Sequence, residues 1–572
     1  MESNWIIKPD ADIEKVRKLA GELNVSHTIA NMLVQRGIET FDTAKTFFRP
    51  ELEHLHDPYL MKDMDVAVDR LNQAMANNEK ILVYGDYDVD GTTSVALLYS
   101  FLKEHYTNLD YYIPDRYAEG YGISLKGIDF ASENDFTLVV ALDCGIKAVE
   151  KIDYANKKNV DFIICDHHTP GDKIPEAVAV LDPKRKDCAY PYKELSGCGV
   201  GFKLVQALSI RNKLNKEKLW DYLDLVAVSI ASDIVPITGE NRVLAYYGLK
   251  RLNKLPRLGL KSLIDIAQLS KKQITISECV FKIGPRINAA GRIKSGKSAV
   301  DLLISENKDF AFTMSRDINR LNETRQNLDK QITEEALKMI AESGELQNSK
   351  STVLYKEDWH KGVVGIVASR VIEHYYKPTV ILTKSNGLAT GSARSVAGFD
   401  LYQAIDACSG LLESFGGHKH AAGLTIKPEN LEKFRLAFET EVARMITPDQ
   451  LTPKVKVDAQ IKLSEITDKF YNIIRQFAPF GPGNMSPVYV SEDVRDGGYS
   501  RAVGQDETHL KLDVVDDSGK HFSGIAFSLA PQYLPAIKQN KKFAICYTVE
   551  ENEYMGRTSL QLRVKEIRMN DI

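Results

Sequence analysis

Between residue 78 and about residue 265, short apolar runs alternate with helical stretches, and this alternation limits the possible folds more than any other feature. The runs "KILVYG", "TLVVAL", "DFIIC" and "AVAVL" are bounded by turn residues and are too short for helices. Helical segments such as "TTSVALLYSFLKEHY" and "GFKLVQALSIRNKL" lie between them. Strands that alternate with helices predict a parallel sheet covered by helices on both faces.

The remainder of the chain predicts further domains, because 572 residues are too many for one hydrophobic core. Residues 307–343 contain no Gly or Pro and predict a helix long enough to bridge two domains, and a second α/β pattern begins at residue 350. Beyond Pro453, apolar and polar residues alternate as in a small all-β barrel. We expect N-terminal helices over 1–75, an α/β domain over 76–265, a helical connector over 266–345, a smaller α/β domain over 346–445 and the barrel over 452–572.

Composition excludes several classes of protein. The seven cysteines are scattered and form no C-x-x-C pair, which argues for a reducing compartment and against a structural zinc site. No apolar run reaches about 18 residues, and the N-terminus lacks the layout of a signal peptide. The net charge of −4 excludes a polybasic coat, although it allows a local basic channel. We expect a cytoplasmic protein that does not enter a membrane.

Carboxylates and imidazoles follow the apolar runs of the first domain. They are Asp86, Asp88 and Asp90 after the first run, Asp143 after the second, Asp166, His167 and His168 after the third, and Asp233 at the end of a later helix-like segment. The carboxyl ends of parallel strands share one edge, so these side chains should converge there. Each alone has a structural explanation, such as a helix N-cap for Asp143. Together they need cations, and oxygen and imidazole ligands without cysteine favour Mn²⁺ or Mg²⁺.

The order of these motifs resembles a known family. "DYDVDG", "LDCG", "DHH" and "ASD" are similar to the four motifs of the DHH phosphoesterase superfamily, and "HKGVVGIVASR", "GSARS" and "FGGHKHAAG" to its DHHA1 partner domain. "IPDRYAEGYG", "GPRINAAGR" and "PFGPGNMSPVYV" resemble the superfamily's bacterial single-stranded-DNA exonucleases. The resemblance covers essentially the whole chain. It implies a parallel-sheet DHH domain and a smaller α/β DHHA1 domain joined by a long helix, followed by a C-terminal OB-fold barrel.

The resemblance also implies two divalent ions, Mn²⁺ or Mg²⁺, and two catalytic residues. By position in the motifs, the ligands would be Asp88 and Asp143 for one ion and Asp90, Asp143, His167 and Asp233 for the other. Asp143 would bridge the ions, and His168 would lie near the scissile phosphate. Pyrophosphatase-like members carry a His four residues before the first ligand, where this chain has Tyr84. The first ion therefore needs another ligand, such as Asp86.

Basic groups outside these motifs would determine the substrate specificity. The segment over 281–297 has five basic residues and no acid, with Arg286 and Arg292 flanking a small-residue turn; a solvated loop is the alternative. By resemblance, the groups that hold the phosphates at the 5′ end are Arg116, Arg286, Ser392 and Arg394, with Gly416, Gly417 and His418 on the DHHA1 face. In the barrel, the candidates for stacking on bases are Tyr489, Tyr499, Phe522 and Phe527.

The leading hypothesis is a metal-dependent exonuclease that degrades single-stranded DNA from the 5′ end to mononucleotides in repair and recombination. An oligonucleotide or cyclic-dinucleotide phosphodiesterase is one alternative, but such relatives resemble only the DHH and DHHA1 regions. A non-catalytic replication scaffold is another, which the intact acidic motifs oppose. By resemblance, the partners are single-stranded DNA, a single-stranded-DNA-binding protein and a RecQ-type helicase. We also expect the chain to be a monomer.

Overall fold

The first sheet is wholly parallel and contains every strand predicted between residues 78 and 265. In the computed structural model, which describes residues 3–569 apart from 294, 540 and 555, its strand order is β3-β2-β4-β5-β6. The predicted runs form β2 (Lys80–Gly85), β4 (Phe136–Leu142), β5 (Asp161–Cys165) and β6 (Ala179–Leu181). The apolar-run pattern misses β3 (Leu109–Tyr112), because this edge strand is only partly buried and has the mixed sequence "LDYY".

Alternate residues of each strand pack against helices on opposite faces of this sheet. Ile81 and Val83 belong to the core formed with α4 (Met64–Ala76), α5 (Val89–Lys103), α8 (Gly197–Arg211) and α10 (Leu223–Ser232). Leu82 and Tyr84 belong to the core formed with α6 (Leu125–Glu133) and α7 (Val149–Lys157). Burial on both faces is typical of a parallel sheet and leaves only its ends open to ligands.

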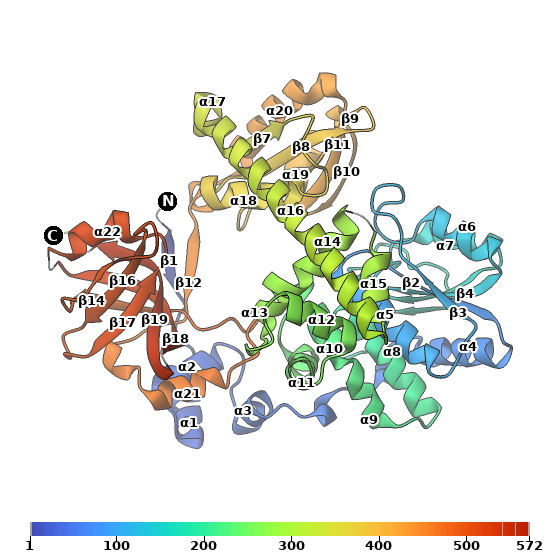
Figure 1. Cartoon of the computed structure of the whole chain (residues 1–572), viewed down its shortest axis with the longest axis horizontal. Coiled ribbons are helices and arrows are strands. Elements are labelled where there is room, and N and C mark those ends of the chain that lie inside the picture. Colours follow the sequence, from blue (N-terminus) through green and yellow to red (C-terminus); the bar gives the residue numbers. More distant parts are fainter. Residues whose placement is uncertain (1–2, 294, 540, 555, 570–572) are drawn as a thin grey trace.

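The predicted long helix is α16 (Lys308–Glu342), which has 35 residues and a length of about 52 Å. Ala311 and Ile318, in its first half, belong to the core of the first sheet. Ile332, Ala336 and Ile340, in its second half, pack with α18 (Val364–Tyr375). One continuous helix therefore contributes to two separate cores and joins the two α/β units (Figure 1).

The second sheet is mixed and has the order β10-β11-β9-β8-β7. The sequence patterns predict β7 (Thr352–Tyr355) and β8 (Thr379–Ser385), which are parallel. Three antiparallel strands follow them, namely β9 (Leu388–Arg394), β11 (Ala421–Ile426) and the edge strand β10 (Leu412–His418). Their sequences are rich in Gly and Ser, so they lack the apolar runs that would predict strands. Helix α20 (Leu431–Met445) supplies Phe434 and Phe438 to the core of this unit.

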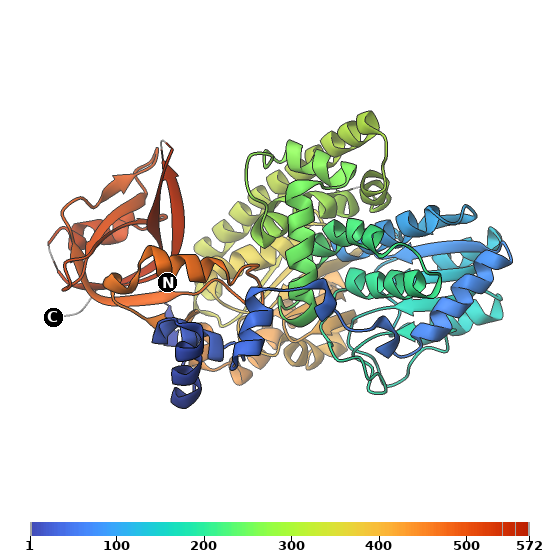
Figure 2. The same ribbon diagram turned by 90° about the horizontal axis from the view of Figure 1, so that it is seen from below.

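The C-terminal region forms the predicted barrel. Its strand order is β13-β14-β18-β19-β17-β16-β15, and an additional pairing of β14 with β16 links the two sides of the sheet. The strands are β13 (Ala459–Gln460), β14 (Tyr489–Asp496), β15 (Arg501–Val503), β16 (His509–Val515), β17 (His521–Ala526), β18 (Phe543–Tyr554) and β19 (Arg557–Met569). The barrel stands apart from the first sheet in both views (Figure 1, Figure 2).

The start of the chain packs on the barrel, which the sequence does not predict. Helices α1 (Ile13–Leu23), α2 (His27–Val34) and α3 (Phe41–Phe48) share a core with the barrel strands. Strand β1 (Asn4–Ile7) pairs in parallel with β12 (Lys454–Val457), a partner too distant in sequence to leave a local signal. In the part of the chain that the structure describes, every helix is too short or too polar to span a bilayer.

Candidate active site

The first three aspartates lie where β2 ends and α5 begins. Asp88 is the N-cap of α5, and its carboxylate accepts a hydrogen bond from the N–H of Gly91 at 3.0 Å. The carboxyl of Asp86 is fully buried. A Cβ on Gly91 would lie 2.4 Å from the carbonyl oxygen of Asp86, so only glycine lets the loop fold back this closely. The "DYDVDG" spacing therefore follows from a tight strand-to-helix turn.

Asp90 is held by the N-terminus of α8. Its two oxygens accept hydrogen bonds from the N–H groups of Gly197 (2.7 Å) and Cys198 (2.8 Å), and from the Ser229 hydroxyl (2.7 Å). The segment "GCGVGF" forms the first turns of α8. A Cβ on Gly197 would lie 2.6 Å from Oδ1 of Asp143, so this glycine also makes room for the next carboxylate.

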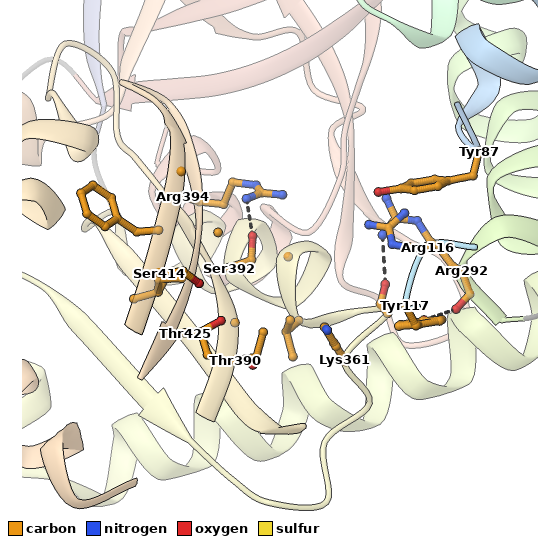
Figure 3. Close-up of a pocket in the computed structure, with 18 residues that line it drawn as sticks. Tyr87, Arg116, Tyr117, Arg292, Lys361, Thr390, Ser392, Arg394, Ser414 and Thr425 are labelled. Atoms are coloured by element: carbon orange, nitrogen blue, oxygen red, sulfur yellow. Dashed lines mark hydrogen bonds between the residues drawn. The ribbon is translucent and has the colours of Figure 1, made fainter. Parts of the chain in front are cut away.

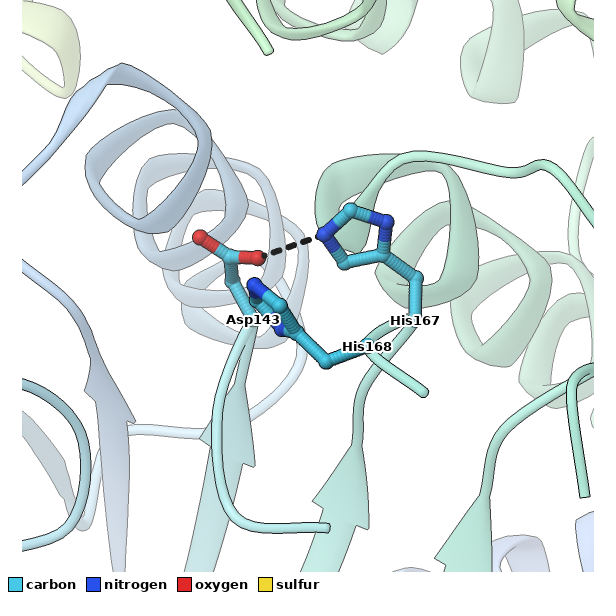
Figure 4. Close-up of side chains that lie close together, drawn as sticks. All are labelled: Asp143, His167 and His168. Atoms are coloured by element: carbon cyan, nitrogen blue, oxygen red, sulfur yellow. Dashed lines mark ion pairs between the residues drawn. The ribbon is translucent and has the colours of Figure 1, made fainter. Parts of the chain in front are cut away.

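Asp143 and His167 bring the remaining segments together (Figure 4). Asp143 follows β4 with a left-handed φ of 60° and donates its N–H to the carbonyl of Cys165 at 2.8 Å. Nε2 of His167 lies 3.2 Å from Oδ1 of Asp143, 3.5 Å from Oδ2 of Asp233 and 3.9 Å from Oδ2 of Asp90. The ends of β2, β4, β5 and α10 therefore deliver these four side chains to one point, as the parallel sheet predicts.

The charges at this point do not balance. Burial and the neighbouring carboxylates raise the pKa of Asp86, Asp88, Asp143 and Asp233. Burial lowers the pKa of His167, so the neutral imidazole cannot neutralise them. Among the described residues, Oδ1 of Asp143 and both ring nitrogens of His167 have no hydrogen-bond partner of acceptable geometry. Buried carboxyl groups that lack a partner are neutralised either by a proton or by a bound cation.

Two groups of ligand atoms are close enough to hold a metal ion. They are Asp143 with His167 and His168, and Asp90 with His167 and Asp233. Oxygen and imidazole donors without a thiolate fit Mn²⁺ or Mg²⁺. Asp86 and Asp88 belong to neither group, although Asp88 lies close enough for its charge to act on Asp143 and Asp233. Oδ2 of Asp86 is buried and has no hydrogen-bond partner among the described residues.

Tyr84 stands where pyrophosphatase-like members carry a His, and its hydroxyl makes hydrogen bonds within the fold. Its ring is 1% exposed. Its hydroxyl donates to the carbonyl of Gly122 at 3.0 Å and accepts from the N–H of Ser124 at 3.1 Å. The phenol therefore anchors the loop before α6.

Asp166, to which the motifs assign no catalytic or ligand role, orients His168. Oδ1 of Asp166 lies 2.7 Å from Nδ1 of His168, and Nε2 of His168 lies 3.2 Å from the hydroxyl of Tyr121. Burial acts to lower the pKa of His168, but the hydrogen bond and charge of Asp166 raise it to about 9. Burial acts to raise the pKa of Asp166, but the same pair lowers it to about 2. A cationic imidazole at the edge of the acidic cluster suits a bound anion.

A basic cleft of about 460 Å³ is shown in Figure 3. It lies next to the acidic cluster, because Tyr87, the residue between Asp86 and Asp88, lines it. One wall carries Tyr87, Arg116, Tyr117 and Arg292; Lys361 and strands β9, β10 and β11 form the other. The guanidinium of Arg116 lies 4.8 Å from the centre of the Tyr87 ring. Arg292 donates to the carbonyl of Gly362 at 2.9 Å, which ties the two walls together. Arg394 donates to the Ser392 hydroxyl at 2.6 Å.

Four cations line this cleft, namely Arg116, Arg292, Lys361 and Arg394. Among the described residues, none of them has an acidic partner within ion-pair distance. Burial, and then the charges of Arg116, Arg325 and Arg394, lower the pKa of Arg292 to about 10. Burial and the charge of Arg116 lower the pKa of Arg394. Cations gathered in a partly desolvated cleft repel one another unless an anion joins them. The cleft therefore fits a polyanion.

The structure brings most, but not all, of the predicted phosphate-binding residues to this cleft. Arg116, Ser392, Arg394 and Gly416 line it. Gly417 and His418 lie next to it on the exposed hairpin of β10 and β11.

Arg286 does not line the cleft. Its guanidinium donates to Asn319 (3.0 Å) and to the carbonyl of Lys282 (2.7 Å). Arg292 takes its place, because both arginines lie on helix α14 (Gly284–Ile293) and the predicted small-residue turn does not exist. Lys294 of the same basic segment lies outside the described residues.

Two of the four aromatic residues proposed for base stacking are part of the barrel core. Tyr489 is 1% exposed and Phe522 is 8% exposed, so neither can stack on a base. Tyr499 and Phe527 are 80% and 51% exposed and remain available. The ring of Phe527 lies 5.1 Å from that of His509, and Arg563 lies 5.5 Å from its centre.

Three protein-family models match the chain. They are the DHH family, N-terminal domain, over residues 80–230, the DHHA1 domain over 348–444, and the RecJ OB domain over 457–566. The chain is 35% identical, over 99% of its length, to the single-stranded-DNA-specific exonuclease RecJ of Bacillus subtilis, of which it covers 71%. It is 31% identical to the RecJ of Escherichia coli over 89% of this chain and 90% of that protein.

The fold is similar to that of solved RecJ structures. The crystal structure of RecJ in complex with Mn²⁺ from Thermus thermophilus matches 100% of this chain and 80% of that one, with a TM-score of 0.85 and 25% identity. A second structure, of exonuclease RecJ bound to manganese, matches 70% of this chain and 98% of that one, with a TM-score of 0.61 and 31% identity.

Proposed function

This chain belongs to the RecJ family of single-stranded-DNA-specific exonucleases, and we propose from that premise that it hydrolyses single-stranded DNA from the 5′ end and releases mononucleotides. It is a metal-dependent phosphodiesterase whose cofactors are divalent ions, Mn²⁺ or Mg²⁺. A cyclic-dinucleotide phosphodiesterase or a scaffold is not favoured, because the barrel matches the RecJ OB domain and the acidic cluster is complete.

The observation that carries this proposal is the continuity of the acidic cluster and the basic cleft. Tyr87 lies between Asp86 and Asp88 in the sequence, and it lines the cleft. Burial and neighbouring carboxylates raise the pKa of Asp86 and Asp88, and the charge of Arg116 opposes that rise. A strand whose terminal phosphate lies between the arginines would therefore extend its next phosphate over the aspartates.

The proposed ligands combine one group of donor atoms, Asp90 with His167 and Asp233, with the ligands that the motif resemblance implies. Asp90, Asp143, His167 and Asp233 would hold one ion, and Asp88 and Asp143 would hold the other. Asp86, whose Oδ2 has no hydrogen-bond partner among the described residues, completes the second site in place of Tyr84. When bound, the two ions supply charge neutralisation and an activated water for in-line attack on the phosphodiester.

The residues of the chain orient the substrate in this reaction. His168, held by Asp166, presents a positive imidazole to the scissile phosphate and is placed to donate a proton at Nε2 to an anionic oxygen. Arg292 and Arg394 bind the terminal phosphate from opposite walls of the cleft. A site that binds a terminal 5′ phosphate can act only from a 5′ end, which gives the polarity.

The test follows a single strand of about 40 nucleotides labelled at its 3′ end. With Mg²⁺ or Mn²⁺, we expect a ladder of shortening products that all keep the label. EDTA should abolish the ladder. Loss of the label as a mononucleotide in the first products would mean attack from the 3′ end, and the proposed polarity would then be wrong.

The partner assignments rest on resemblance, whereas the cellular location and the domain bounds rest on sequence patterns. The partners are a single-stranded-DNA-binding protein and a RecQ-type helicase, and the chain acts as a cytoplasmic monomer. We propose that the chain divides into N-terminal helices over 1–75, a DHH domain over 76–265, a helical connector over 266–345, a DHHA1 domain over 346–445 and an OB-fold domain over 452–572. Co-purification with labelled partners and a light-scattering mass would test the first two assignments.

A further inference from the structure

The basic cleft holds more positive charge than one terminal phosphate can neutralise. A phosphate monoester carries about −1.5 to −2 charges at neutral pH. The charge of Arg116 acts on Asp86 and Asp88 without an ion pair. Arg292, Lys361 and Arg394 line the cleft and have no carboxylate within ion-pair distance among the described residues. Three cations remain for fewer than two negative charges.

The floor of the cleft also extends beyond the place where Ser392 and Arg394 meet. On one face of the second sheet, β9, β11 and β10 align three rows of residues. The rows are Arg394, Ala421 and His418; Ser392, Gly423 and Gly416; and Thr390, Thr425 and Ser414. Residues 390 and 394 are about 13 Å apart along the strand. The three rows of residues are therefore longer than a single phosphate.

The last row consists of hydroxyls that all line the cleft. Within the described ranges, the side chains of Thr390, Thr425 and Ser414 make no hydrogen bond to another residue, so they are free to donate to a ligand. In the middle row, Gly423 and Gly416 have no side chain, so a ligand can reach the backbone between Arg394 and the row of hydroxyls. The volume of about 460 Å³ lies in the range that accommodates a whole small molecule, about 300–1,000 Å³.

We propose that this cleft accepts single strands whose 5′ end carries a di- or triphosphate, and that it binds them more tightly than strands with a 5′ monophosphate. The inference rests on the proposed function. The terminal phosphates lie over the hydroxyl row beside Lys361, and the phosphate next to the sugar lies between Arg292 and Arg394. In the first turnover, water adds to the phosphorus between nucleotides 1 and 2 and the 3′ oxygen of nucleotide 1 leaves. The products are a nucleoside polyphosphate and a strand with a 5′ monophosphate.

The experiment compares one DNA sequence with a 5′ hydroxyl, a 5′ monophosphate or a 5′ triphosphate. Binding is measured by fluorescence anisotropy with the Asp143→Ala protein, which should not cut. We expect affinity to rise in that order, with about a tenfold gain from monophosphate to triphosphate, the effect of one further charge-assisted hydrogen bond. With the wild-type protein and Mg²⁺, mass spectrometry should identify a nucleoside triphosphate as the first product.

Two variants locate the effect within the cleft. Lys361→Ala removes a charge, and Thr425→Val removes the central hydroxyl with little change of shape; each should bring the triphosphate-to-monophosphate affinity ratio close to one. Lys384→Ala is the matched control, because this lysine lies on β8 of the same sheet and pairs with Glu357 outside the cleft. It should keep the wild-type ratio.

The outcomes separate the two proposals. If the monophosphate strand is cut but the triphosphate strand binds no better, or is cut more slowly, the cleft holds a single phosphate and this inference is wrong. A tenfold gain that Lys384→Ala reduces as much as Lys361→Ala would mean general electrostatic attraction and would overturn it too. If no strand is cut from its 5′ end, the proposed function itself fails.

Discussion

The acidic cluster and the basic cleft lie side by side, carry opposite charge and are built in opposite ways. The cluster gathers at the carboxyl edge of a parallel sheet, with Asp233 added from the end of α10. The cleft forms where separate parts of the chain meet, and its cations come from a loop (Arg116), a helix (Arg292), a loop of the second unit (Lys361) and a strand (Arg394). Each region lacks its counter-charge, and bound ions and a DNA strand would supply both. The sheet edge therefore positions the proposed metal ligands, and the junction between the two α/β units positions the groups that would bind the substrate.

The largest expected effect is at the acidic cluster. Asp143→Asn keeps the shape of the side chain but removes the charge that we assign to both ions. We expect the hydrolysis rate to fall by about 10³-fold or more, which equals about 4 kcal/mol of transition-state stabilisation. Single-turnover kinetics on a 5′-phosphorylated strand would measure it.

Asp143→Asn should not weaken the binding of DNA, unlike a variant such as Arg394→Ala that removes a cation from the cleft. Without metal, loss of a negative charge in Asp143→Asn should leave the affinity for the strand equal or higher. Weaker binding by the variant in EDTA would contradict the division of roles between the two regions. The circular dichroism spectrum serves as the control for folding.

The second effect is at the cleft. Arg394→Ala removes a charged donor that is held in place by Ser392. We expect a loss of about 10- to 100-fold in kcat/KM on 5′-phosphorylated strands, because hydrogen bonds to charged groups contribute about 1.5–3 kcal/mol. Strands with a 5′ hydroxyl should lose much less. Equal losses on both substrates would show that Arg394 supports the fold and does not read the terminal phosphate.

How well each region can be predicted from sequence follows from how it is built. The spacing of apolar runs is enough to place Asp86, Asp143 and His167 at one sheet edge, because strand ends are local features. Arg292 and Lys361 have no such signal, since Arg292 reaches the cleft through a contact with Gly362, 70 residues away. Likewise, the alternation beyond Pro453 predicts the barrel but not strand β1, whose partner β12 (Lys454–Val457) is far away in the sequence.

The third prediction concerns stability and pH. The pKa values of Asp86, Asp143 and Asp233 are raised in the folded chain. Their contribution to the free energy of unfolding is therefore complete below their ordinary pKa of about 4, and it is lost as pH rises through the raised values. His168 acts in the same direction. Its contribution is complete below its ordinary pKa of 6.5 and is lost as pH rises through about 9.

Without metal, both effects should lower the Tm as pH rises from 6 to 9. Divalent ions neutralise the carboxylates, so the difference in Tm between Mg²⁺ and EDTA should widen with pH by a few degrees, the size expected for about 1 kcal/mol. Differential scanning fluorimetry would measure it. In Asp143→Asn the widening should shrink. A difference in Tm that is constant across this range would mean that the cluster does not bind the ions.

The smallest effect separates two arginines on one helix. Arg286 and Arg292 are six residues apart, which places them about 120° apart around an α-helix, so only one of them can face the cleft. Arg292 lines the cleft, whereas Arg286 binds Asn319 and the carbonyl of Lys282. We therefore expect Arg286→Ala to change the preference for 5′-phosphorylated over 5′-hydroxyl strands by less than about twofold, and Arg292→Ala to reduce it by about tenfold or more. Competition between the two strands in one reaction would measure both ratios. Equal losses in the two variants would place Arg286 in the phosphate site, as the motif resemblance implies, and would mean that α14 turns when DNA binds.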